Sequence, residues 1–206
     1  MTGGSEDPKR RLATLRLEPA LCESVLFMLA LGLLVWADCV FRGRMLFQRD
    51  LSLFFSGWME AFARSVADGS WPVWNPYPSY GQPMLATATA QILYPTTWLN
   101  LILPASIYLT VFAVLHVVVA GLGGWALVRG LGASHRAGLV AGAVWATSGP
   151  VLSTVHMTNM YAAAAWMPWV GHLGHRTLAA RSRRHAVLWG GALALTILAG
   201  SPYHRD

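Results

Sequence analysis

The sequence predicts an all-α integral membrane protein with about five transmembrane or half-spanning helices and a large, structured extracytoplasmic first loop. Of the 206 residues, 55% are hydrophobic and only 12% are charged, whereas about 25% of the residues of an average soluble domain are charged. The apolar residues also form long runs, separated by segments rich in Arg, Gly, Pro and aromatic residues. Runs of this kind are typical of helices that cross a bilayer.

The first transmembrane helix is expected at residues 21–41, after a polar cytoplasmic tail of residues 1–20. A cleaved signal peptide would have a shorter apolar region followed by small residues at the cleavage site. Here the run contains Trp36 and Asp38 near its end, so the helix is expected to stay in the protein. Cys22 and Cys39 lie roughly 25 Å apart along it, which is beyond the roughly 7 Å that a disulfide can bridge.

The extracytoplasmic loop is expected at residues 42–104. Its first part, residues 51–67, has apolar side chains at spacings of three and four and predicts an amphipathic helix that can lie in the membrane interface. Residues 69–95 are rich in Trp, Tyr, Pro and Gly, which favours a structured loop against the bilayer. Residues 91–103 are expected to form a short interfacial or re-entrant helix.

The remaining transmembrane helices are expected within residues 105–206, at 105–128, 137–153, 159–173 and 186–199. The third and fourth spans are short, and the fourth contains Pro168, so half-spans are an alternative for both. Small residues recur four positions apart at Ala120 and Gly124 and at Gly138 and Gly142. This spacing predicts close packing between helices.

The net charge of +6 follows from orientation in the membrane, because most basic residues fall in segments expected on one side of it. With a cytoplasmic N-terminus, the inside segments contain Lys9, Arg10, Arg11, Arg16, Arg129, Arg136, Arg176, Arg181, Arg183 and Arg184. The outside segments contain Arg42, Arg44, Arg49, Arg64 and Arg205. This asymmetry agrees with the positive-inside rule and argues against a nucleic-acid partner.

Asp50 is the candidate catalytic residue. It lies outside, shortly after the first span and before the amphipathic helix. A carboxylate there can take a proton from an acceptor hydroxyl. The alternative is a helix N-cap, for which Asp is well suited, and the residues alone favour the cap.

The candidate substrate-binding residues lie in the same loop and just beyond it. Arg42, Arg44 and Arg49 can hold a phosphate through paired N–H groups, although contact with lipid headgroups explains them equally well. The other candidates have aromatic rings or polar groups that suit sugars: Trp74, Asn75, Tyr77, Gln91, Tyr94 and His156. An interfacial aromatic belt and hydrogen bonds within the loop are the simpler explanations. Asp38 and His116, in the spans, are weaker candidates, with solvated and packing roles as alternatives.

A series of short motifs follows in order along the chain. They are Arg49-Asp50, Gly69-x-Trp71-Pro72-x-Trp74-Asn75-Pro76-Tyr77, Gly81-x-Pro83-x-x-Ala86, Gln91-x-x-Tyr94-Pro95, His116, Gly121-x-Gly123, Arg129-x-x-Gly132, Ser148-Gly149, His156, Trp166-x-Pro168 and Ala199-Gly200-x-Pro202. In this order they resemble the N-terminal part of YfhO-type bacterial membrane proteins, which belong with the GT-C group of membrane glycosyltransferases. The resemblance covers about residues 45–204.

The resemblance implies a multi-pass protein of the bacterial inner membrane, with membrane lipids around it and a GT-C-like N-terminal part. It would move a sugar from a polyprenyl-phosphate donor to an extracytoplasmic acceptor, with Asp50 as base. Some GT-C members use a divalent metal, but the loop offers no clear second carboxylate, so no metal ligands are assigned. Family members are several times longer, which implies a truncated form or a partner subunit that supplies the missing part. The alternative is a non-catalytic membrane subunit or transporter-like component that binds lipid or a partner.

Overall fold

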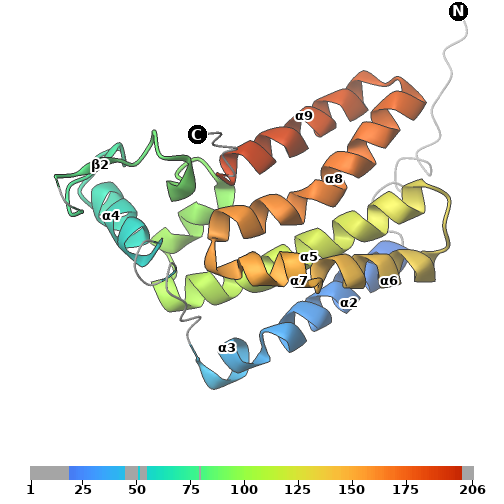
Figure 1. The fold of residues 1–206 in the computed structure, drawn as a ribbon, viewed down its shortest axis with the longest axis horizontal. Helices are drawn as coiled ribbons and strands as arrows, with labels where there is room; N and C mark the ends of the chain where they lie inside the picture. The colour runs from blue at the N-terminus through green and yellow to red at the C-terminus, as the bar shows by residue number, and fades with distance from the viewer. Residues whose placement is uncertain (1–18, 45–50, 52–54, 79, 201–206) are drawn as a thin grey trace, which may run out of the picture.

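The computed structural model describes residues 19–44, 51, 55–78 and 80–200, and in these residues the chain is mostly helical. The described part contains a bundle of long helices: α2 (Pro19–Val35), α5 (Ala105–Gly130), α6 (His135–Ala146), α8 (Thr158–Ala180) and α9 (Arg183–Leu198). Helix α5 lies in the middle and packs against α2, α6 and α8, while α9 packs on α8 (Figure 1). The described part of the chain is therefore mostly helical, as expected, and it also contains a two-stranded sheet.

The described part also contains short elements, most of which gather on the left of Figure 1. They are α3 (Ala37–Arg42), α4 (Ser56–Ala67), β1 (Trp74–Asn75), β2 (Gln82–Pro83), the 3-10 helices η2 (Ala88–Ala90) and η3 (Pro95–Leu101), α7 (Gly149–Leu152) and the 3-10 helix η4 (Ser153–His156). The strands β1 and β2 form an antiparallel hairpin in which Trp74 lies opposite Pro83. We refer to residues 55–104, from the start of α4 to the start of α5, as the loop domain.

The helices of the bundle correspond to the expected spans, with three differences, the first being that the span expected at residues 21–41 is divided into α2 and α3. The third expected span is divided into α6 and the segment Gly149–His156, which meet at an angle of 44°. The fourth is one helix, α8, which continues through Pro168. A proline inside a helix removes one backbone hydrogen bond. Packing against neighbouring helices therefore has to stabilise α8 at this point. The indole of Trp169 supplies part of it by donating to the Val119 carbonyl of α5 at 2.8 Å.

Among the described helices, α5 is the one that is long and apolar enough to cross a membrane by itself. The bent pair formed by α6 and Gly149–His156 passes the same test when taken together. Helix α2 is apolar but has 17 residues, and the first expected span is interrupted after it at Trp36, where α3 begins. Length and composition therefore identify one spanning helix, or two if the bent pair is a single span.

Helix α4 is amphipathic, as expected, but its apolar face packs against the rest of the loop domain. Phe62 is fully buried, in a cluster with Met84 and Ile92. Its ring makes an edge-to-face contact with Trp98, with centroids 5.2 Å apart. The apolar face of α4, which was expected to lie in the membrane interface, therefore forms a small hydrophobic core with other residues of the loop domain.

The segment 91–103, expected as a helix, contains 3-10 turns instead. Gln91 has a left-handed backbone conformation with φ of 55°, which interrupts a right-handed helix. Pro95 then starts η3, and the indole of Trp98 donates to the carbonyl of Ile92 at 3.0 Å. The local backbone thus follows the positions of Gln91 and Pro95 more than the apolar periodicity.

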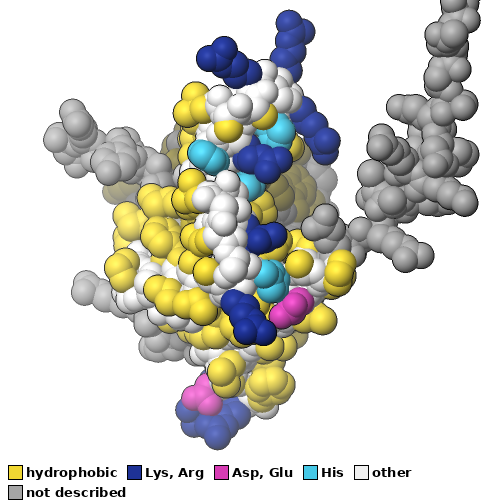
Figure 2. Space-filling view, turned by 90° about the vertical axis from the view of Figure 1, so that its right-hand side faces the viewer, with side chains coloured by type: hydrophobic (Ala, Val, Ile, Leu, Met, Phe, Trp, Pro, Cys, Tyr) yellow, Lys and Arg dark blue, Asp and Glu magenta, His cyan; other side chains and the backbone are white. Residues whose placement is uncertain are grey.

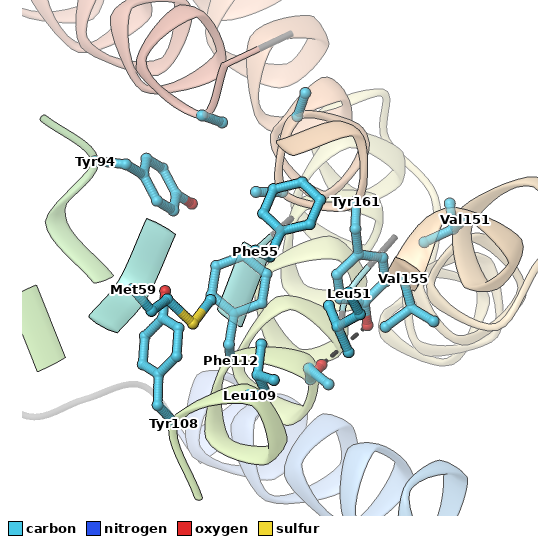
Figure 3. Packing of buried hydrophobic residues seen from close by; sticks show 14 residues of the cluster. Leu51, Phe55, Met59, Tyr94, Tyr108, Leu109, Phe112, Val151, Val155 and Tyr161 are labelled. Carbon is cyan, nitrogen blue, oxygen red and sulfur yellow. Dashed lines mark hydrogen bonds between the residues drawn. The ribbon is translucent and has the colours of Figure 1, made fainter. Parts of the chain in front are cut away.

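A second apolar cluster joins the loop domain to the bundle. Leu51, Phe55 and Met59 pack on Tyr108, Leu109 and Phe112 of α5 and on Tyr161 of α8 (Figure 3). The hydroxyl of Tyr161 donates to the carbonyl of Ala113 at 2.9 Å. This buried contact holds the loop domain against the end of the helices.

Glycines bring α5 and α6 into backbone contact, as the spacing of small residues predicts. A Cβ atom on Gly142 would lie 2.2 Å from the carbonyl oxygen of Gly121. A Cβ atom on Gly124 would lie 2.9 Å from the Cα atom of Gly142. Since side chains cannot occupy such distances, only glycine permits this helix separation.

The opposite end of the bundle is basic. It contains the start of α2 and the α5–α6 and α8–α9 turns, and it includes the exposed residues Arg129, Arg136, Arg176, Arg181, Arg183 and Arg184. Figure 2, which views this end, shows Arg and His side chains along its centre and hydrophobic side chains at its flanks. The described residues among those expected inside the cell therefore lie together at one end.

Candidate functional site

Asp50 and Arg49, the candidate base and one candidate phosphate ligand, lie outside the described residues. The nearest described residues before and after them are Arg44 and Leu51. Arg44 is exposed near the end of α3, and Leu51 is buried in the cluster between α5 and α8. The catalytic assignment of Asp50 thus stays a prediction.

An apolar groove of about 620 Å³ runs between α2 and α5. Its walls consist mainly of Leu, Val and Ile side chains, among them Leu29 and Leu33 of α2 and Val111 and Val118 of α5. Arg44 lines the end of the groove at which α5 begins. The groove therefore combines a long apolar surface with a cation at one end.

Arg44 belongs to a three-residue ion-pair cluster. Arg44 and Arg42 both bind the carboxylate of Asp38, at 3.2 and 2.8 Å. Each guanidinium group has five N–H donors, so both retain donors for a further anion. Because the three charges sum to +1, the cluster remains attractive to phosphate. Asp38 therefore has the role of an ion-pair partner on the solvent side of the helix.

The aromatic candidates of the hairpin lie on the surface of the loop domain. Trp74 is 51% exposed, and its indole covers Gly81, where a Cβ atom would lie 2.5 Å from Nε1. Tyr77 is 62% exposed and accepts a hydrogen bond from Arg64, whose guanidinium lies 5.3 Å from its ring centroid. Asn75 is buried and closes a turn, since its Oδ1 accepts from the Tyr77 backbone N–H at 3.1 Å. Trp74 and Tyr77 are accessible to a ligand, whereas Asn75 is structural.

Gln91 connects three parts of the chain inside the protein. Its Nε2 donates to the Ala199 carbonyl at 2.8 Å, and its Oε1 accepts from the Thr158 hydroxyl at 2.9 Å. Its backbone carbonyl accepts from the Thr97 hydroxyl at 2.8 Å. With its amide used at both ends, Gln91 holds the loop domain to the start of α8 and the end of α9.

Tyr94 occupies the centre of a buried hydrogen-bond chain. His116 Nδ1 lies 2.7 Å from the Phe112 carbonyl, which can only accept, so Nδ1 carries the proton. His116 Nε2 therefore accepts from the Tyr94 hydroxyl at 2.7 Å, and the Tyr94 oxygen accepts from Trp166 Nε1 at 2.9 Å. Burial raises the pKa of Tyr94 to about 12, although the Trp166 hydrogen bond opposes this rise. The phenol thus keeps its proton at neutral pH.

The sequence-based candidates do not form one site. Gln91 and Tyr94 are buried connectors, Trp74 and Tyr77 lie on the hairpin surface, and His156 is half-buried at the end of η4. The packing role considered for His116 agrees with its buried hydrogen bonds. Gln91 and Tyr94 thus hold distant parts of the fold together, and their assignment as substrate-binding residues stays a prediction.

The structure also contains a cavity that the sequence did not indicate, which we call the loop cavity. It measures about 390 Å³ and is lined by Phe55, Trp58, Gln82, Thr87, Thr89 and Asn159, together with Met157. These residues come from the start of α4, the hairpin, η2 and the start of α8. One available signal was the pair Thr158 and Asn159, which is polar at the start of an otherwise apolar segment.

Within the described residues, no three His, Cys, Asp or Glu side chains are close enough to hold a metal ion. Cys22 and Cys39 are both free. No protein-family model, curated protein or solved structure matches the chain in the comparisons made.

Proposed function

We propose that this chain is a membrane-embedded, GT-C-like glycosyltransferase unit that takes a sugar from a polyprenyl-phosphate donor at the extracytoplasmic face. The single observation that carries the proposal is the apolar groove between α2 and α5 with Arg44 at its end. A polyprenyl phosphate is a long apolar chain with an anionic headgroup, so its two parts match the two parts of the groove.

The surface of the bundle supports a membrane location. Large apolar side chains on α2, α6, α8 and α9 are exposed: Leu26, Leu34, Val140, Val144, Leu178, Val187 and Ile197. Monomeric soluble proteins rarely expose large contiguous apolar patches. The basic end with its Arg residues suits the cytoplasmic face, which leaves the loop domain and the Arg44 end of the groove outside.

In the proposed reaction, Asp50 removes the proton of an acceptor hydroxyl. The hydroxyl oxygen then bonds to the anomeric carbon, and the lipid phosphate leaves with the electron pair of the carbon–oxygen bond that breaks. Arg44 and Arg42 would stabilise the negative charge on the departing phosphate. A partner subunit that completes the acceptor side is part of the proposal.

A second candidate function is lipid binding without catalysis, as in a membrane subunit or transporter-like component. The observation that favours it is the structural role of Asn75, Gln91 and Tyr94, since their hydrogen bonds stay within the protein. Under this alternative the groove holds the lipid, and Asp50 is an N-cap.

Lipid binding by the groove can be measured with purified protein in detergent. We expect Arg44→Gln to weaken the binding of undecaprenyl phosphate about tenfold, because a charge-assisted hydrogen bond to phosphate is lost. Arg64→Gln is the matched control, since Arg64 is an exposed arginine of the same loop region that binds Glu60 and Tyr77. Equal affinities of the wild type and both variants would contradict the assignment of the groove.

Catalysis requires a separate test in cells. In a bacterial host from which the gene for this protein has been deleted, we expect the wild type to restore cell-surface glycan modification. At matched membrane abundance, Asp50→Asn should fail to restore it. Asp68→Asn serves as control, because Asp68 is an exposed carboxylate in the same loop, at the end of α4. Activity of Asp50→Asn equal to that of the wild type, with lipid binding intact, would favour the non-catalytic alternative.

A further inference from the structure

The loop cavity contains a buried amide that is only half satisfied. Asn159 is 2% exposed, and its Nδ2 donates to the Gly200 carbonyl at 2.8 Å. That carbonyl can only accept, so it determines which end of the amide is nitrogen. Among the described residues, the Asn159 Oδ1 atom has no hydrogen-bond partner. In contrast, the neighbouring amide of Gln91 uses both of its ends.

A buried acceptor without a partner costs free energy, and at the wall of a cavity a bound ligand can remove that cost. Asn159 lines the loop cavity together with two threonines, Thr87 and Thr89, and with Gln82. The Thr87 hydroxyl donates to the Pro83 carbonyl at 2.6 Å, and its oxygen can still accept. The Oδ1 atom is itself buried, so its contact with a ligand hydroxyl requires a rotation of the Asn159 side chain, and such rotations on binding are common.

The remaining lining residues determine the charge and shape of the ligand. The described residues that line the cavity carry no formal charge, so they offer nothing to balance an ionic ligand. Phe55 and Trp58 add two aromatic side chains to the polar groups. An aromatic surface beside several hydroxyl and amide groups fits a molecule that is apolar on its ring face and polar at its edge. The volume of about 390 Å³ is at the small end of the range for ligand sites.

We propose that the loop cavity binds one neutral sugar ring. Trp58 packs on the C–H face of the ring, and the Oδ1 atom of Asn159 accepts a hydrogen bond from a ring hydroxyl, while Thr89 and Gln82 bind further hydroxyls. The assignment of the loop cavity as the sugar subsite of a glycosyl-transfer site rests on the proposed function. Binding itself does not require transfer, so the two can be tested separately.

Binding is tested on the full chain in detergent with free glucose, galactose and N-acetylglucosamine, by ligand-detected NMR. We expect at least one of them to bind the wild type and Trp58→Leu to weaken that binding at least fivefold. Thr89→Val, which keeps the side-chain shape, should weaken it about threefold. Thr177→Val is the matched control, because Thr177 is a part-buried threonine of α8 whose hydroxyl bonds only to Leu173 among the described residues. Asn159→Leu should abolish binding, and its thermal unfolding shows whether the loss comes from misfolding.

Whether the sugar ring belongs to the donor or to the acceptor is tested with two further probes, undecaprenyl phosphate with and without a hexose. If the donor sugar occupies the cavity, Thr89→Val weakens the binding of the hexose-bearing lipid as well as that of free sugar, and leaves the binding of undecaprenyl phosphate unchanged. If the acceptor sugar does, Thr89→Val weakens only the binding of free sugar. Absence of sugar binding to the folded wild type, or equal affinities of Thr89→Val, Trp58→Leu and the wild type, would overturn the proposal. If Thr89→Val and Trp58→Leu transfer sugar at the same rate as the wild type, the cavity is not the sugar subsite, but the proposed function still stands.

Discussion

Gly142→Leu is expected to prevent stable assembly of the helix bundle. Even the Cβ atom of the new side chain would lie 2.2 Å from the Gly121 carbonyl oxygen of α5 and 2.7 Å from Cε of Met28. Because the first of these atoms belongs to a helix backbone, α5 and α6 must separate. Overpacking a tight contact usually costs about 1 to 3 kcal/mol, and a displaced backbone places this variant at or above about 3 kcal/mol. The measurement is the midpoint of thermal unfolding in detergent.

Gly191→Ala is the control for this prediction. Gly191 lies on the exposed surface of α9, and a Cβ atom there meets no other atom within 4 Å. Alanine favours a helix over glycine by about 1 kcal/mol, so this variant should unfold at the same temperature as the wild type or slightly above it. A Gly142→Leu protein that is as stable as the Gly191→Ala protein would show that α5 and α6 are not in backbone contact.

Tyr94→Phe has the second largest expected effect. The substitution keeps the ring and removes one hydroxyl, which leaves His116 Nε2 without its donor and Trp166 Nε1 without its acceptor. A buried polar group left unpaired costs about 1 to 3 kcal/mol. We therefore expect a loss of about 2 to 3 kcal/mol in the free energy of unfolding, measured by denaturant titration in mixed micelles.

Tyr77→Phe removes the same atom from an exposed tyrosine. The Tyr77 hydroxyl accepts only a long hydrogen bond of 3.3 Å, from Arg64, and water can replace it. The expected change is within about 0.5 kcal/mol. Equal losses in the two variants would mean that the chain from Trp166 through Tyr94 to His116 does not stabilise the fold.

The hydrophobic pattern predicted where helices occur better than it predicted where they bend or break. Long apolar runs predicted α5 and α9 closely, because in such runs the backbone satisfies its own hydrogen bonds and composition determines the rest. The fourth expected span contains Pro168, with a half-span as the alternative, and in the structure α8 continues through Pro168, next to which Trp169 donates to a carbonyl of α5. The bend between α6 and α7 was not predicted in detail, because it depends on contacts with distant residues.

The roles of the candidate site residues stay predictions, and there is a physical reason why the sequence alone does not decide them. Polar and aromatic side chains in a loop look the same in sequence whether they face a ligand or another part of the protein. Gln91 and Tyr94 were expected to bind substrate, yet their partners lie in α5, α8 and the end of α9. Asn159 was overlooked because its significance depends on one unpaired oxygen and on a cavity formed by three distant segments.

The sequence by itself determined the helical class and the presence of small residues suited to close helix packing, because each depends on composition or on spacing along one helix. The tertiary structure alone decided which polar residues hold the loop domain in place and which face a cavity. It also decided that the apolar face of α4 is buried by Met84 and Ile92. These properties depend on contacts between residues far apart in the chain, and no local pattern encodes them.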